Sequence, residues 1–165
     1  MGRFCFSPAY RVALPLMLCM VAAIIITPLL ATQPPALAAF LGYYSFSFVC
    51  HQENDRVFHL HGAALPVCAR CCGIYLGSLA MLLAFGLLRR TDPAVPARLW
   101  LLLILAPMGL DVLARNLGWH AGQPDLLLRA TTGFIAGGGI TLYLIPLLNR
   151  AWREILTVKK GELSW

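Results

Sequence analysis

Long apolar segments separated by short polar ones dominate the pattern of residues along this chain. The segment from Val12 to Ala31 contains no charged residue, and three later segments are nearly as apolar. A helix needs about 20 apolar residues to cross the roughly 30 Å of hydrocarbon in a bilayer. The pattern therefore predicts about four membrane spans, at residues 12–31, 71–88, 98–116 and 126–148.

The first apolar segment follows a short basic start, as a secretory signal would. Its apolar part is longer than the 7–15 residues typical of a signal core, which favours an uncleaved membrane anchor. Cleavage after Ala36-Leu37-Ala38 is the alternative, because small residues stand where a signal peptidase would cut.

The pattern changes between the first two spans. Gln33-Pro34-Pro35 interrupts helical structure, because proline lacks an amide donor and restricts the residue before it. Residues 36–49 are apolar and aromatic but too short for a span, and they predict a short interfacial segment. A polar loop rich in cysteine and histidine, residues 50–72, follows it, and a basic tail, residues 149–165, ends the chain.

Composition supports a membrane protein. The chain is 59% hydrophobic and 12% charged, whereas soluble domains are about 25% charged. We expect an all-α polytopic helical bundle that forms a single membrane domain over residues 1–165. The net charge of +6 does not indicate nucleic-acid binding, because the basic residues lie at segment ends and not along one face. The expected partner is the lipid bilayer.

The distribution of Lys and Arg predicts the orientation. Nine of the 13 lie in the amino end, the connection at residues 89–98 and the tail, whereas four lie in or near the other two connections. Cytoplasmic loops are enriched in these residues. We therefore expect both termini in the cytoplasm and the cysteine-rich loop outside it, whether or not the first segment is cleaved.

Glycine spacing predicts which spans touch. Gly73-x-x-x-Gly77 lies in the second span and Gly133-x-x-x-Gly137 in the fourth. Such spacing lets two helix backbones approach closely, so these two spans are expected to pack together. The alternative is a face for a homo-oligomer or another membrane protein partner.

The cysteine-rich loop contains most of the candidate chemistry. Cys68-x-x-Cys71, preceded by Cys50-His51, supplies three thiols and an imidazole. Zinc prefers four such ligands in tetrahedral geometry, and two ligand pairs separated by a short loop are typical of zinc sites. The residues thus predict an extracytoplasmic metal site, with zinc as the favoured cofactor, at Cys50, His51, Cys68 and Cys71. His59 and His61 are further nitrogen ligands within reach.

The same cysteines allow other functions. A Cys-x-x-Cys pair at a helix start can be redox-active, since the helix dipole and the adjacent Arg70 favour a thiolate. Cys68 and Cys71 would then serve a membrane thiol–disulfide oxidoreductase, or a disulfide would only staple the loop. An accessory subunit of a larger membrane complex is the third alternative. The sequence leaves open which applies, and whether the protein is an enzyme.

Three ionisable residues lie within or beside the last two spans. Asp111 and Arg115 are four apart on one helix face, and Arg129 begins the next span. Charged groups in a membrane are costly and are commonly paired or functional. We expect Asp111 to pair with Arg115 or Arg129, in a structural or a functional role.

Three further residues are candidates for binding. Arg56 and Arg70 could bind an anionic headgroup or a carboxylate, because guanidinium groups match the geometry of both. Tyr75 is either a functional residue or an ordinary aromatic residue of the membrane interface.

The chain resembles a known family at these residues. The first matching block is Cys50-His51 with Arg56, Pro66-Val67-Cys68-Ala69-Arg70-Cys71, Gly73, Tyr75 and Gly77. The second is Pro107, Asp111, Leu128-Arg129, Thr132-Gly133 and Gly137. Together they resemble the small prokaryotic predicted membrane proteins grouped as domain of unknown function 2085. The resemblance implies a helical protein of the prokaryotic cytoplasmic membrane and implies no activity. Cys72 stands where this family more often has a hydroxyl residue.

Overall fold

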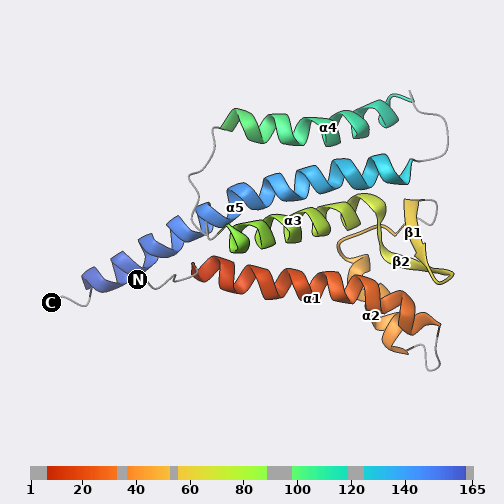
Figure 1. Cartoon of the computed structure of the whole chain (residues 1–165), viewed down its shortest axis with the longest axis horizontal. Helices are drawn as coiled ribbons and strands as arrows, with labels where there is room; N and C mark the ends of the chain where they lie inside the picture. The colour runs from red at the N-terminus through yellow and green to blue at the C-terminus, as the bar shows by residue number, and fades with distance from the viewer. Residues whose placement is uncertain (1–6, 33–36, 53–55, 89–97, 119–124, 163–165) are drawn as a thin grey trace.

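The chain forms a helical bundle with one small β-hairpin at its end (Figure 1). The computed structural model describes residues 7–32, 37–52, 56–88, 98–118 and 125–162. The elements in order are α1 (Pro8–Ala31), α2 (Leu37–Ser47), β1 (Val57–Leu60), β2 (Ala63–Cys68), α3 (Ala69–Leu87), α4 (Arg98–Asn116) and α5 (Leu126–Glu162). The predicted all-α membrane bundle is confirmed, and the hairpin is an addition to it.

Helices α3 and α5 lie side by side in the middle of the bundle, with α1 along α3 and α4 along α5 (Figure 1). Helix α1 begins, and α5 ends, at the same end of the bundle. Helix α2 and the hairpin lie at the opposite end. The start of α1 and the end of α5 are thus separated from the hairpin by the length of the bundle.

The helices have the lengths that a bilayer requires. Among the described residues, Pro8–Ala31, Ala69–Leu87 and Leu126–Ile155 are long and apolar enough to cross a membrane, and Leu99–Ala114 is a shorter apolar helix. Helix α4 as a whole has 19 residues, which corresponds to about 28 Å at 1.5 Å per residue. That length is close to the roughly 30 Å of a hydrocarbon core. The predicted number of spans therefore holds approximately.

Two predicted boundaries differ from the structure. Helix α3 begins at Ala69 and not at residue 71, because β2 leads directly into its N-cap at Cys68. Residues 149–162 are not a separate tail, because α5 continues to Glu162. The chain offers no helix-breaking residue between Pro146 and Gly161, so helix α5 continues beyond the apolar segment.

The contact between α3 and α5 depends on glycine. A Cβ atom at any glycine of the two predicted motifs would collide with a backbone carbonyl oxygen of the opposing helix. These glycines are Gly73, Gly77, Gly133 and Gly137. Ser78 Oγ also donates a hydrogen bond of 3.1 Å to the carbonyl oxygen of Gly137. The expected packing of the second and fourth spans within one chain is confirmed.

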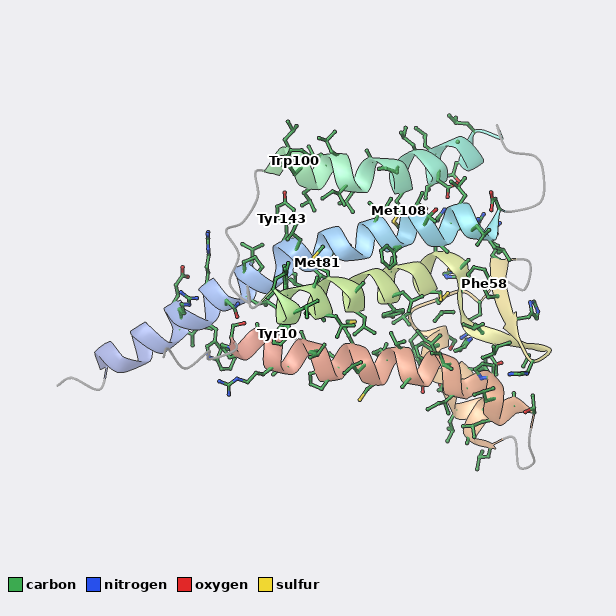
Figure 2. All side chains as sticks on the ribbon, in the orientation of Figure 1. Tyr10, Phe58, Met81, Trp100, Met108 and Tyr143 are labelled. Carbon is green, nitrogen blue, oxygen red and sulfur yellow. The ribbon has the colours of Figure 1, made fainter. Side chains whose placement is uncertain are left out.

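Two clusters of buried side chains close the bundle at its ends. One joins α1, α3 and α5 through Tyr10, Leu82, Phe85 and Ile145. The other, the hairpin core, joins α1, α2 and β2 through Ile24, Phe46, Cys50 and Val67. Nitrogen and oxygen atoms of side chains gather at the two ends, whereas carbon dominates the middle of the helices (Figure 2). This distribution suits a bundle whose middle lies in hydrocarbon.

Replacement of a contact glycine should destabilise the bundle. In Gly137→Ala the new methyl group would meet the backbone of Ile74, and overpacking of this kind costs about 1–3 kcal/mol. The matched control is Gly109→Ala on α4, where a Cβ would meet no atom within 4 Å. Thermal unfolding in detergent should show a lower Tm for Gly137→Ala than for wild type. The Tm of Gly109→Ala should equal that of wild type. Equal Tm values would contradict the glycine-dependent contact.

Candidate functional site

The β-hairpin brings Cys68 to the start of α3. Strands β1 and β2 are antiparallel, with Leu60 opposite Ala63 at the turn and Val57 opposite Cys68 at the open end. The two turn residues, His61 and Gly62, have φ angles of 51° and 82°. Two-residue turns with both φ values positive match the twist of a hairpin and favour glycine. The predicted loop at residues 50–72 is therefore in part a hairpin, which the His61-Gly62 pair between apolar segments signals.

Cys50 is fixed just beyond the end of α2. Its amide donates a hydrogen bond of 2.9 Å to the carbonyl oxygen of Phe46. Two residues later, Gln52 donates from Nε2 to the carbonyl oxygen of Tyr43 at 2.8 Å. The hydroxyl of Tyr43 donates in turn to the carbonyl oxygen of Ala64 in β2. Helix α2, the segment of Cys50 and the hairpin are thus connected by hydrogen bonds.

Three thiols meet where these elements converge. The Sγ atoms of Cys50, Cys68 and Cys71 all lie within 4.8 Å of one another, and we call this group the thiol cluster. The amide of Cys68 donates to Sγ of Cys50 at 3.1 Å. Thiolates bound tetrahedrally at about 2.3 Å from zinc have sulfurs about 3.8 Å apart. A small inward movement of the thiols would reach that geometry, so the cluster could hold a metal ion.

The histidine side chains lie outside the thiol cluster, although His51 was predicted as a metal ligand. Among the described residues, the group of mutually close ligand atoms contains the three thiols and not the His51 imidazole. His51 is exposed and lines a cavity next to the cluster. His59 and His61 are exposed on the hairpin. The structure thus brings together three of the four predicted ligands.

The Cys68 thiol lies outside the membrane spans and is more acidic than a free cysteine thiol. Its pKa is lowered from 9.0 to about 5, chiefly because the Cys71 thiol donates a hydrogen bond to its sulfur. Burial opposes this shift, whereas the backbone amides of Cys71 and Arg70 and the thiol of Cys50 reinforce it. Cys68 is also the N-cap of α3, where the helix dipole favours negative charge. A thiolate, the form needed by a metal ligand or a nucleophile, is therefore favoured at neutral pH.

Cys72 and Tyr75 lie beside the cluster without belonging to it. Both are partly buried and pack against the hairpin core. Cys19 is exposed on α1, and each cysteine of the described part of the chain is free. Cys72 is consequently a neighbouring thiol that can serve as a control for the cluster.

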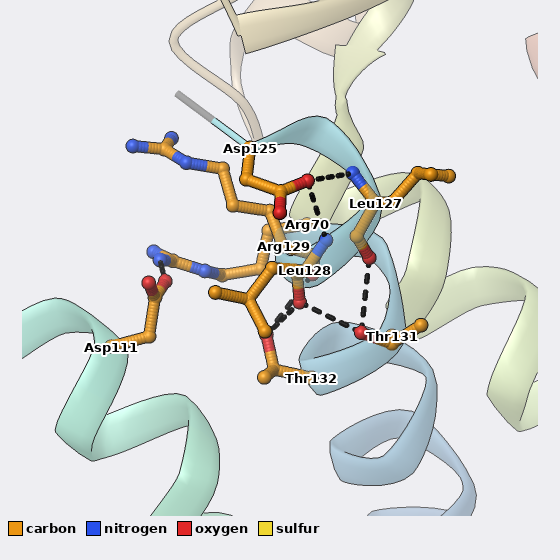
Figure 3. A network of polar contacts seen from close by, with 8 residues as sticks. All are labelled: Arg70, Asp111, Asp125, Leu127, Leu128, Arg129, Thr131 and Thr132. Atoms are coloured by element: carbon orange, nitrogen blue, oxygen red, sulfur yellow. Dashed lines mark hydrogen bonds and ion pairs between the residues drawn. The ribbon is translucent and has the colours of Figure 1, made fainter. Parts of the chain in front are cut away.

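Asp111 forms an ion pair that the sequence did not indicate. Arg70 Nη2 donates to Asp111 Oδ2, which joins the start of α3 to α4 (Figure 3). The side chains are 20% and 5% exposed, respectively. The expected partners, Arg115 and Arg129, are near Asp111 in sequence or lie at a span end, whereas Arg70 is 41 residues away. The Arg115 side chain lies outside the described residues.

Arg129 lies in the first turn of α5, close to the same ion pair (Figure 3). Asp125 caps this helix, because its Oδ1 accepts hydrogen bonds from the amides of Leu127 at 3.0 Å and Leu128 at 3.1 Å. Such a cap satisfies amides that have no partner within the helix. It fixes the position of Arg129, which is only 5% exposed.

A cavity of about 300 Å³ connects the thiols with the arginines. We call it the arginine pocket, and its lining residues are Cys50, His51, Gln52, Arg56, Cys68, Arg70 and Arg129. The sequence presented these arginines as separate candidates in three segments. The fold places them around one space, with two thiols of the cluster, Cys50 and Cys68, in its wall.

The helices and this site define a small polytopic membrane protein with a thiol cluster at one end of its bundle. The family described as "Predicted membrane protein (DUF2085)" matches residues 50–143, more than half of the chain, and the chain belongs to this family. It is 34% identical over 106 residues to the uncharacterized protein MJ1492 of Methanocaldococcus jannaschii, covering 64% of this chain and 67% of the relative. An uncharacterized protein of Methanothermobacter thermautotrophicus is 34% identical over 97 residues, covering 59% of this chain and 85% of the relative. No solved structure matches the chain.

The family match covers the whole candidate site. It begins at Cys50 and ends at Tyr143 within α5, so it contains the thiol cluster, the Arg70–Asp111 ion pair and the arginine pocket. Helices α1 and α2 precede it. The resemblance stated from the sequence is thereby confirmed, and the printed family description names a membrane protein and no activity.

The Arg70–Asp111 pair should behave as one unit in a double-mutant cycle. Removal of one partner leaves a buried charge uncompensated, which costs about 3–5 kcal/mol. Arg70→Gln and Asp111→Asn should each lower the free energy of unfolding in detergent, whereas the double variant should lose less than the sum. We expect a coupling energy of about 1–3 kcal/mol. Strictly additive losses would contradict the pairing.

Proposed function

We propose that this protein binds a zinc ion at the membrane interface, through Cys50, Cys68 and Cys71 with His51 as the fourth ligand. The observation that carries the proposal is the convergence of three thiols within 4.8 Å. They come from the end of α2, the end of the hairpin and the first turn of α3. Thiolate and imidazole ligands in tetrahedral geometry suit zinc.

Local electrostatics support a metal at this place. Zinc binds thiolates, and the low pKa of Cys68 reduces the free energy needed to deprotonate the ligand set. A zinc ion with three thiolates carries one net negative charge, and Arg70 lies in the same pocket wall as Cys50 and Cys68. His51 directly follows Cys50 and is exposed, so its imidazole can turn toward the thiols without disturbing the core.

The site is proposed to lie on the extracytoplasmic face of a prokaryotic cytoplasmic membrane, with both termini in the cytoplasm. The Lys and Arg distribution supports this orientation. The bundle supports the placement of both termini on the side opposite the site, because the start of α1 and the end of α5 lie at the end away from the hairpin (Figure 1).

A thiol–disulfide oxidoreductase is the second candidate function. The observation that favours it is the position of Cys68 as N-cap of α3, with Cys71 one turn later and close to it. In such a function the two thiols would form a disulfide and pass two electrons to an acceptor. The third thiol favours the metal site instead, because Cys50 is buried against Cys68 and a two-cysteine redox pair does not need it.

Metal analysis of the purified protein tests the choice between these functions. Wild-type protein should contain close to one zinc ion per chain, with the thiols of the cluster reduced. Cys50→Ser and Cys71→Ser should each lose most of the metal, because each removes a thiolate ligand. Cys72→Ser, which changes a neighbouring thiol outside the cluster, should retain it.

Two results would contradict the metal site. One is full zinc content in Cys50→Ser. The other is metal-free wild-type protein in every preparation, with two thiols that appear only after reduction and map to Cys68 and Cys71. The second result would support the oxidoreductase in its place.

Labelling with a membrane-impermeant maleimide tests the orientation. His59→Cys places a thiol on the exposed hairpin, and Arg150→Cys places one on the exposed surface of α5 toward the opposite end. In intact cells His59→Cys should be labelled, whereas Arg150→Cys should be labelled only after the membrane is opened. The reverse pattern would place the cysteine-rich end in the cytoplasm.

A further inference from the structure

Three arginines from separate segments line the arginine pocket. Arg56 lies just before β1, Arg70 in the first turn of α3 and Arg129 in the first turn of α5. None of the residues described as lining the pocket carries a carboxylate. A cavity in which three guanidinium groups converge attracts anions, because the attraction strengthens where water is partly excluded.

The surrounding contacts hold these arginines in position. Asp111 accepts a hydrogen bond from Arg70 but does not line the pocket. It therefore orients the Arg70 guanidinium and leaves the other N–H donors of Arg70 available. Arg129 is 5% exposed and begins a helix capped by Asp125. Arg56 and Arg129 make further contacts of their own. Fixed donors lose little conformational freedom when an anion binds.

We propose that the arginine pocket binds the phosphate group of a ligand. Guanidinium groups form paired hydrogen bonds to phosphate or carboxylate oxygens. Donors that approach from three segments match the oxygens of a tetrahedral phosphate better than the two coplanar oxygens of a carboxylate. The cavity of about 300 Å³ far exceeds the roughly 10–15 Å³ needed for one water molecule, so it admits the phosphate and part of the group that carries it.

The phosphate can come from two sources. The pocket lies at the hairpin end of a membrane bundle, within reach of lipid headgroups, and a free phosphate in solution offers the same chemistry. The proposed phosphate donors are arginines and not zinc ligands, although Cys50, His51 and Cys68 line the same pocket. Measurement of phosphate binding with zinc and after chelation therefore distinguishes a failure of the phosphate site from a failure of the metal site.

Equilibrium binding of inorganic phosphate and of phosphatidylglycerol to the full chain in neutral detergent tests the proposal. Phosphate is measured at constant ionic strength, and lipid by its retention after gel filtration, with phosphatidylcholine for comparison. Arg56→Gln and Arg129→Gln should weaken binding by about tenfold or more, the effect of losing a charged hydrogen-bond pair. Arg150→Gln, an exposed change on the same helix as Arg129, is the matched control. Each preparation is measured both with zinc and after chelation.

Each outcome decides the proposal. Binding of inorganic phosphate that both pocket variants weaken and the control retains supports a free phosphate ligand. Binding of phosphatidylglycerol alone, with the same dependence on the pocket variants, supports a lipid headgroup. Absence of both, or equal binding by wild type and Arg56→Gln, overturns the proposal. Arg56 is only partly buried, so Arg56→Gln decides the result even if Arg129→Gln fails to fold.

Discussion

The close approach of α3 and α5 is the constraint on which the rest of the structure depends. Glycines on both helices let the two backbones touch, and a Cβ at Gly133 would meet the carbonyl oxygen of Arg70. That contact sets the first turns of the two helices against each other. Arg70 and Arg129, which lie in those turns, are consequently brought to one place. A wider separation filled by larger side chains would leave the pocket without one of its walls.

The site then follows from what is attached to the start of α3. The hairpin ends at Cys68, the helix begins at Ala69, and Cys71 lies one turn later. Helix α2 brings Cys50 against the same turn, where its sulfur accepts the Cys68 amide. The three thiols and Arg70 therefore lie at one helix terminus. This arrangement places the acidic Cys68 thiol, which suits a metal ion, beside cationic side chains, which suit an anion.

Much of the bundle could be predicted from the sequence, because span length and small-residue spacing are local properties. The glycine motifs even predicted the correct helix pair. The cysteines were grouped correctly, since ligand spacing is also local. Other features depend on tertiary structure: the sequence gives no sign that Arg70 would pair with Asp111, 41 residues away, or that Arg56 and Arg129 would line one cavity. The pair His61-Gly62 between two apolar segments is a signal for a hairpin turn, and the sequence could have predicted a hairpin where a loop was expected.

X-ray absorption at the zinc edge tests the central claim most directly. The purified wild-type protein should show three sulfur neighbours at about 2.3 Å and one nitrogen neighbour at about 2.0–2.1 Å. That set corresponds to Cys50, Cys68 and Cys71 with His51. A spectrum with only nitrogen and oxygen neighbours would contradict a site built on the thiol cluster, and four sulfur neighbours would remove His51 from it.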